Sequence, residues 1–65
     1  MSDLRIVVVG AAGRMGRNLI QAINGTPGLA LTGALERTGS AVLGEDSGNL
    51  AGCGSNNILI SDDPL

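Results

Sequence analysis

Three glycines spaced three residues apart directly follow an apolar segment near the N-terminus. The run 7–9 (VVV) ends at Gly10, and Gly13 and Gly16 come next. A strand that turns into a helix at such a sequence leaves backbone N–H groups without partners and exposes the positive end of the helix dipole. Both features attract a phosphate group. The spacing therefore predicts a cradle of backbone atoms for the diphosphate of a nucleotide.

Each of these glycines has a separate role in a dinucleotide-binding fold. Gly10 permits the tight turn, Gly13 lets the backbone approach the diphosphate, and Gly16 lets the helix pack closely on the sheet. The spacing GxxGxxG departs from the more common GxGxxG, but its position between a strand and a helix favours cofactor binding. The alternative is a turn that serves packing alone. The phosphate loop of nucleotide triphosphatases fits less well, because no Gly-Lys-Ser/Thr follows.

A carboxylate and a guanidinium group adjoin each other at the end of the second expected strand. Glu36 falls 20 residues after Gly16, where an acidic side chain accepts hydrogen bonds from the adenosine ribose hydroxyls. Arg37 can pair with the additional 2′-phosphate of NADP through a charge-assisted contact. The pair predicts that both NADH and NADPH are used. For Glu36 the alternative is a solvated carboxylate at a strand end.

Other reactive side chains carry weaker signals. Arg14 can contact a phosphate of either cofactor, or it is an exposed residue at a helix start. Asp62 and Asp63 invite an acid or metal interpretation, but the proline that follows favours a helix cap. Cys53 lies among glycines, with no cation beside it to activate a thiol, so we interpret it as a small apolar residue. One cysteine and no histidine argue against a disulfide or a metal site.

The elements that position these residues follow a β-α-β-loop-β order. Residues 4–9 form an uninterrupted apolar run, which predicts a strand buried on both faces of a parallel sheet. Residues 14–24 predict a helix, and the sequence Asn24-Gly25 ends it. Residues 29–35 predict a second strand, joined to the first by a right-handed crossover. The apolar side of the helix is predicted from its spacing, and it comprises Met15, Leu19, Ala22 and Ile23.

The second half of the chain is less regular. Gly33 indicates close packing of the second strand against the helix. Residues 38–57 predict a loop with one short helical turn, and residues 58–60 predict a third strand. Residues 61–65 (SDDPL) then resemble the start of a helix. We therefore expect an α/β protein whose incomplete Rossmann-like parallel sheet belongs to a larger two-domain protein.

Composition excludes several classes of partner. The net charge is −2, with four arginines and no lysine, so the chain lacks a basic surface for nucleic acid. No apolar segment approaches the roughly 20 residues that cross a bilayer. The apolar run 6–9 is too short for a signal peptide and Asp3 interrupts its basic flank, so we do not expect one. We expect a cytoplasmic protein with a small-molecule ligand.

Beyond these patterns, the sequence resembles a known family. Residues 10–17 (GAAGRMGR), followed by 35–37 (LER), are similar to the N-terminal segment of bacterial dihydrodipicolinate reductase, also called 4-hydroxy-tetrahydrodipicolinate reductase. Residues 43–48 (LGEDSG) and 50–52 (LAG) fit the loop that follows the second strand in that family. The resemblance extends over essentially the whole chain, and it is far more specific than the glycines alone.

The resemblance implies a homotetrameric oxidoreductase of lysine and diaminopimelate biosynthesis. NADPH or NADH reduces 4-hydroxy-tetrahydrodipicolinate to tetrahydrodipicolinate in that family. Residues 1–65 would be the N-terminal part of the dinucleotide-binding domain. The substrate and catalytic elements lie in a later domain, so this segment supplies no catalytic residue and is not expected to be active alone. The cofactor-binding residues implied are Gly10, Ala11, Ala12, Gly13, Arg14, Met15, Glu36 and Arg37.

The sequence also leaves two alternatives open. One is another NAD(P)-binding Rossmann enzyme or redox sensor with the GxxGxxG spacing, such as an extended short-chain dehydrogenase. The other is a non-catalytic nucleotide-binding module.

Overall fold

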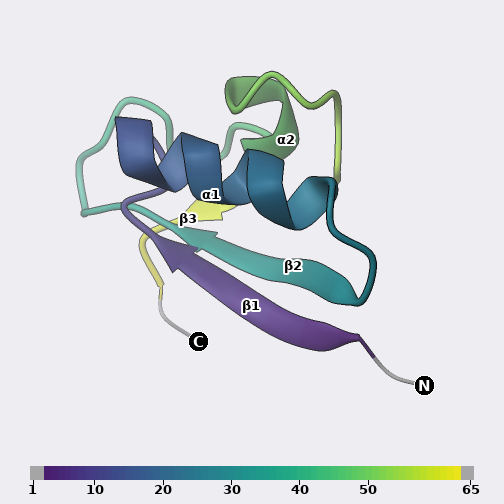
Figure 1. The fold of residues 1–65 in the computed structure, drawn as a ribbon. Helices are drawn as coiled ribbons and strands as arrows, with labels where there is room; N and C mark the ends of the chain where they lie inside the picture. The colour runs from purple at the N-terminus through teal and green to yellow at the C-terminus, as the bar shows by residue number, and fades with distance from the viewer. Residues whose placement is uncertain (1–2, 64–65) are drawn as a thin grey trace.

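A computed structural model describes residues 3–63 as a three-stranded parallel sheet with two helices (Figure 1). The order of the strands in the sheet is β1-β2-β3, and both pairings are parallel. The α/β class and the order of the elements are confirmed, with a short helix inside the expected loop. The elements are β1 (Leu4–Val9), α1 (Arg14–Asn24), β2 (Leu29–Leu35), α2 (Ser47–Leu50) and β3 (Ile60–Ser61).

The first three elements have the predicted bounds. The backbone N–H of Gly25 donates to the carbonyl oxygen of Gln21 and closes the last turn of α1. Strands β1 and β2 then pair side by side, with Val9 opposite Leu35. Because parallel strands point the same way, the glycine turn after β1 and the residues after β2 lie at the same edge of the sheet.

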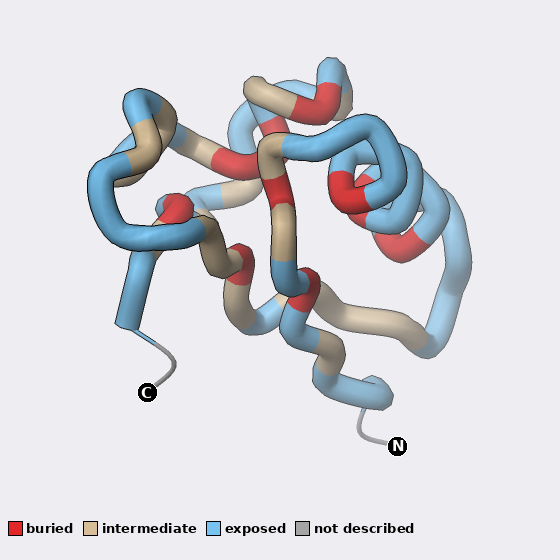
Figure 2. Tube along the Cα trace, turned by 90° about the vertical axis from the view of Figure 1, so that its left-hand side faces the viewer, coloured by how far each residue is buried: buried red, intermediate tan, exposed pale blue. Residues whose placement is uncertain are grey.

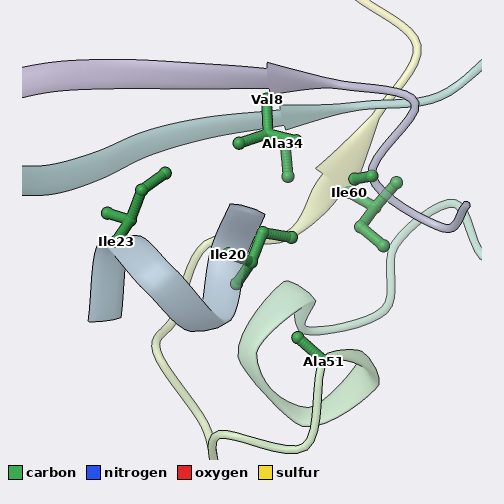
Figure 3. Packing of buried hydrophobic residues seen from close by; sticks show 7 residues of the cluster. Val8, Ile20, Ile23, Ala34, Ala51 and Ile60 are labelled. Atoms are coloured by element: carbon green, nitrogen blue, oxygen red, sulfur yellow. The ribbon is translucent and has the colours of Figure 1, made fainter. Parts of the chain in front are cut away.

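The core lies between α1 and one face of the sheet. Val8 of β1 and Ala34 of β2 point toward Ile20 and Ile23 of α1 (Figure 3). The buried residues of α1 are Gly16, Ile20 and Ile23, and the side facing the solvent is exposed along its length (Figure 2). The sequence-based choice of the buried side was wrong in three of its four residues, because Met15, Leu19 and Ala22 are exposed.

A backbone contact determines which side of α1 faces the sheet. Residues 16, 20 and 23 share one face of a helix, since they are four and three positions apart. Gly16 is pressed against the backbone of the glycine turn, and this contact turns its face of the helix toward the sheet. Apolar spacing alone does not report a backbone contact of this kind.

Strand β1 is buried on one face only. Val8 is 3% exposed, whereas Val7 is 52% and Val9 is 76% exposed. Alternate residues of a strand point to opposite faces, and both helices lie on the same side of the sheet (Figure 1). The prediction of burial on both faces is therefore wrong for residues 3–63.

The prediction for Gly33 is also wrong. A Cβ atom at this position would lie 3.3 Å from Cγ2 of Val7, a residue of the neighbouring strand, and not against α1. The register of β1 and β2 is irregular between Ile6 and Val7, directly beside this contact. The glycine thus accommodates a β-branched neighbour on the sheet.

The third strand is shorter and later than predicted. It comprises residues 60–61, whereas the prediction was 58–60. Ile58 and Leu59 pair with the start of α2 and its N-cap instead: the N–H of Ser47 donates to the carbonyl oxygen of Ile58 (2.9 Å), and Asp46 and Leu59 form an antiparallel bridge. The helix start predicted at Pro64 lies outside the described residues. Within residues 3–63, neither helix has the length and apolar character to span a membrane.

Asp46 organises the connection between β2 and β3. Its carboxylate caps α2 by accepting from the N–H of Asn49 (3.0 Å). It also accepts from the hydroxyl of Ser55 (2.8 Å) and from the N–H groups of Asn56 (3.1 Å) and Asn57 (2.9 Å). These hydrogen bonds favour the charged form and hold the pKa of Asp46 well below its usual range. One side chain thereby joins both ends of this loop.

The depressed pKa of Asp46 predicts a loss of stability in acid. The unfolded chain takes up a proton near pH 4, whereas the folded chain does so only at lower pH, so folding stability falls as the pH drops below about 4. In the full-length protein, the variant Asp46→Asn should be less stable at pH 7 and lose less stability between pH 5 and pH 2.5. Urea unfolding at several pH values measures both effects, and equal pH slopes for the two proteins would contradict this role.

Candidate nucleotide-binding site

The glycine turn is fastened to the end of β2 by backbone hydrogen bonds. The N–H groups of Gly10 and Ala11 both donate to the carbonyl oxygen of Leu35, at 2.9 and 3.0 Å. One oxygen thus receives two successive amides, which the strand pairing brings beside it. This contact does not depend on the side chain at position 35, so no sequence pattern signals it.

Glu36, which follows β2, lies beside the turn. The N–H of Ala12 donates to Oε2 of Glu36 at 2.9 Å. The Oε1 atom of the same carboxylate accepts from the N–H of Arg37 at 3.2 Å. Glu36 is half-buried and Arg37 is exposed. The structure thus brings together an acidic side chain and the backbone of the turn from positions 24 residues apart.

The free N–H groups lie in the first turn of α1. The amides of residues 10–12 bind the end of β2, and the N–H of Gly13 donates to the carbonyl oxygen of Gly10 (3.0 Å). The first hydrogen bond of the helix runs from Arg17 to the carbonyl oxygen of Gly13 (2.9 Å). Within residues 3–63, the amides that lie between Gly13 and Arg17 have no acceptor; they are those of Arg14, Met15 and Gly16.

The surroundings of these amides favour an anion. No acidic residue occupies the first turn of α1, and Gly13 at its N-cap has no side chain to cap it. Neither the first turn of α1 nor its N-cap therefore compensates the partial positive charge of the helix N-terminus. Arg14 and Arg17 are exposed on this turn and add two cations. Such an N-terminus can bind a phosphate through its backbone.

The three glycines are required for different reasons. Gly10 has a φ of +74°, a conformation that L side chains rarely adopt. A Cβ atom at Gly16 would overlap the carbonyl oxygen of Gly10 and lie 2.8 Å from Cα of Ala11. At Gly13 a Cβ atom would sit 3.4 Å from the nearest atom, and the residue is exposed. The fold itself thus requires glycine at positions 10 and 16 but admits a methyl group at 13.

The other singled-out side chains have less defined surroundings. Within the described part of the chain, the guanidinium groups of Arg14 and Arg37 have no hydrogen-bond or ion-pair partner. Cys53 is half-buried against the core, as expected of a small apolar residue. The N–H of Asp63 donates to the hydroxyl oxygen of Ser61 (3.0 Å).

A strand, a glycine turn, a helix and a second strand followed by an acidic residue together define an α/β protein of the Rossmann type. The sequence pattern of the family "Dihydrodipicolinate reductase, N-terminus" matches residues 4–65. This match covers nearly the whole chain, and the chain belongs to this family.

Individual relatives agree with the family match. The 4-hydroxy-tetrahydrodipicolinate reductase of Rhizobium meliloti is 58% identical over 64 residues, which are 98% of this chain and 26% of the relative. The protein of that name from Afipia carboxidovorans is 59% identical over 63 residues (97% and 23%). That from Methylocella silvestris is 55% identical over 65 residues (100% and 24%). The chain therefore spans about a quarter of the length of these relatives.

The contact at Gly16 predicts a large cost for a single methyl group. In the full-length protein, Gly16→Ala should lower the free energy of unfolding by about 3 kcal/mol, because helix and turn must separate to make room. The control is Gly25→Ala, where a Cβ atom would lie 3.6 Å from its nearest neighbour and φ is −92°. This variant should change stability by less than about 1 kcal/mol. Urea unfolding compares the two, and similar stabilities would refute the close contact.

Proposed function

We propose that this chain forms the adenosine-diphosphate part of the NADPH or NADH site in a 4-hydroxy-tetrahydrodipicolinate reductase. The proposal rests on the amides of Arg14, Met15 and Gly16, which have no acceptor within residues 3–63, and on the Glu36 carboxylate, which is bonded to the turn just before them. An anion and a pair of ribose hydroxyls, held a short distance apart, complement these groups. Adenosine diphosphate combines both features.

The residues present suit such a cofactor. The diphosphate would lie over the first turn of α1, where the uncapped amides and Arg14 offer hydrogen bonds and positive charge. Gly13 leaves the backbone accessible to it. The cofactor-binding residues that we propose are Gly10, Ala11, Ala12, Gly13, Arg14, Met15, Glu36 and Arg37. In this set Gly10, Ala11 and Ala12 shape the turn, since their amides already have acceptors.

The acidic and basic neighbours after β2 would distinguish the two cofactors. The Glu36 carboxylate suits the ribose hydroxyls of NADH. The exposed guanidinium group of Arg37 suits the 2′-phosphate of NADPH. Each cofactor finds one charge-complementary partner, which supports the use of both.

The whole protein would reduce 4-hydroxy-tetrahydrodipicolinate to tetrahydrodipicolinate in lysine and diaminopimelate biosynthesis. The bound nicotinamide supplies the hydride. As the resemblance implies, substrate binding and proton transfer would belong to a further domain, which agrees with the lack of histidine and lysine in this chain. By its resemblance to the reductase family, the whole protein would be a homotetramer in the cytoplasm. The family match favours this enzyme over the other Rossmann proteins and over a non-catalytic module.

A substitution at Gly13 should affect cofactor binding without affecting folding. In the full-length enzyme, Gly13→Ala should leave the free energy of unfolding within about 1 kcal/mol of the wild type, since the methyl group has room. The same methyl group would obstruct the diphosphate and weaken NADH binding by about tenfold or more. Calorimetric titration measures the affinity, and unchanged binding would contradict a cofactor at this turn.

The pair after β2 predicts opposite changes in cofactor preference. Glu36→Ala should weaken NADH more than NADPH, and Arg37→Ala should weaken NADPH more than NADH, each by about 10- to 100-fold. Dissociation constants for both cofactors give the two ratios. Thr38→Ala, an exposed neighbour whose side chain has no hydrogen bond within residues 3–63, serves as the control. Equal losses for both cofactors in each variant would refute the assignment.

A further inference from the structure

We propose that Glu36 is also a positioning residue: its carboxylate holds the glycine turn in the shape that leaves the first amides of α1 free. The main support for this proposal is the hydrogen bond of 2.9 Å from the Ala12 N–H to Oε2 of Glu36. A carboxylate that served the ribose alone would need no bond to the turn. The part of this proposal that concerns cofactor affinity rests on the proposed function.

The hydrogen bond of the Ala12 amide lies at the centre of the turn, between those of its two neighbours. The amide before it, of Ala11, binds the carbonyl oxygen of Leu35, and the amide after it, of Gly13, binds the carbonyl oxygen of Gly10. Both of those bonds join backbone to backbone. Among the described residues, the acceptor for Ala12 is the Glu36 side chain alone. The hydrogen bond at the centre of the turn therefore depends on which residue stands at position 36.

The same carboxylate can hold the turn and still bind a ribose. An ionised carboxylate has about four acceptor positions. The amides of Ala12 and Arg37 occupy two of them, at 2.9 and 3.2 Å. Two positions remain for the two hydroxyls of the ribose. Because the bonds to the turn already fix the side chain, ribose binding costs less conformational entropy. The two roles thus support each other.

The experiment uses the full-length protein and two ligands. One is NADH, and the other is its analogue with 2′,3′-dideoxyadenosine in the adenosine half, which keeps the diphosphate but has no adenosine ribose hydroxyls. Glu36→Ala should weaken the analogue about tenfold. Glu36→Gln should bind it within about twofold of the wild type, because the amide oxygen still accepts from the Ala12 N–H. Glu45→Ala, an exposed carboxylate of the next connection, should leave both ligands unaffected.

A second measurement needs no cofactor. Hydrogen exchange at the Ala12 amide of the free protein, followed by NMR, should accelerate about tenfold in Glu36→Ala and stay near the wild-type rate in Glu36→Gln. An unchanged rate in Glu36→Ala overturns the proposal.

The two measurements also separate this proposal from the proposed function. Equal binding of the analogue by the wild type and Glu36→Ala would limit Glu36 to the ribose and overturn the positioning role. An equally large loss in Glu36→Gln would overturn it as well. If the wild type bound neither ligand, the proposed function would fail, and the exchange rates would still decide whether Glu36 holds the turn.

Discussion

The structure depends on how three successive amides are attached to the end of β2. Gly10 and Ala11 donate to one carbonyl oxygen, and Ala12 donates to a carboxylate one residue further on. This attachment bends the chain out of β1 and directs it into α1 over the face of the sheet that carries the core. A turn without these acceptors would have no fixed direction, because its backbone groups would exchange their partners for water.

The attachment also determines where an anion can bind. The amides of residues 10–13 already have acceptors, so within residues 3–63 the amides that remain available are those of Arg14, Met15 and Gly16, at the uncapped start of α1. Gly16 belongs to this set and at the same time packs against the carbonyl oxygen of Gly10. The contact that places the helix on the sheet therefore also places its N-terminus. Folding and the preparation of the candidate site result from the same short segment.

Much of this could be predicted from the sequence, because the signals are local. Strand β1, helix α1 and strand β2 begin and end where apolar runs meet the glycine turn and the Asn24-Gly25 stop. The neighbourhood of Glu36 and the turn follows from the parallel pairing of the two strands. The start of β3 could not be predicted, because Ile58 and Leu59 pair with the segment that Asp46 holds in place. The orientation of α1 about its axis and the acceptor of the Gly10 and Ala11 amides could not be predicted, because apolar spacing does not report backbone contacts.

The open face of β1 adds a constraint on the whole protein. Parallel sheets are commonly covered on both faces, and Val7 and Val9 are exposed here. The relatives are about four times as long as this chain, so a structure of the full length would show what contacts this face.

A crystal structure of the full-length protein with NADH bound would test this site most directly. Diphosphate oxygens should lie within hydrogen-bond distance of the Arg14 and Met15 amides, with the Ala12 N–H still bonded to Glu36 and the ribose hydroxyls on the same carboxylate. A diphosphate bound away from the first turn of α1, or a Glu36 side chain turned away from both the turn and the ribose, would contradict this arrangement.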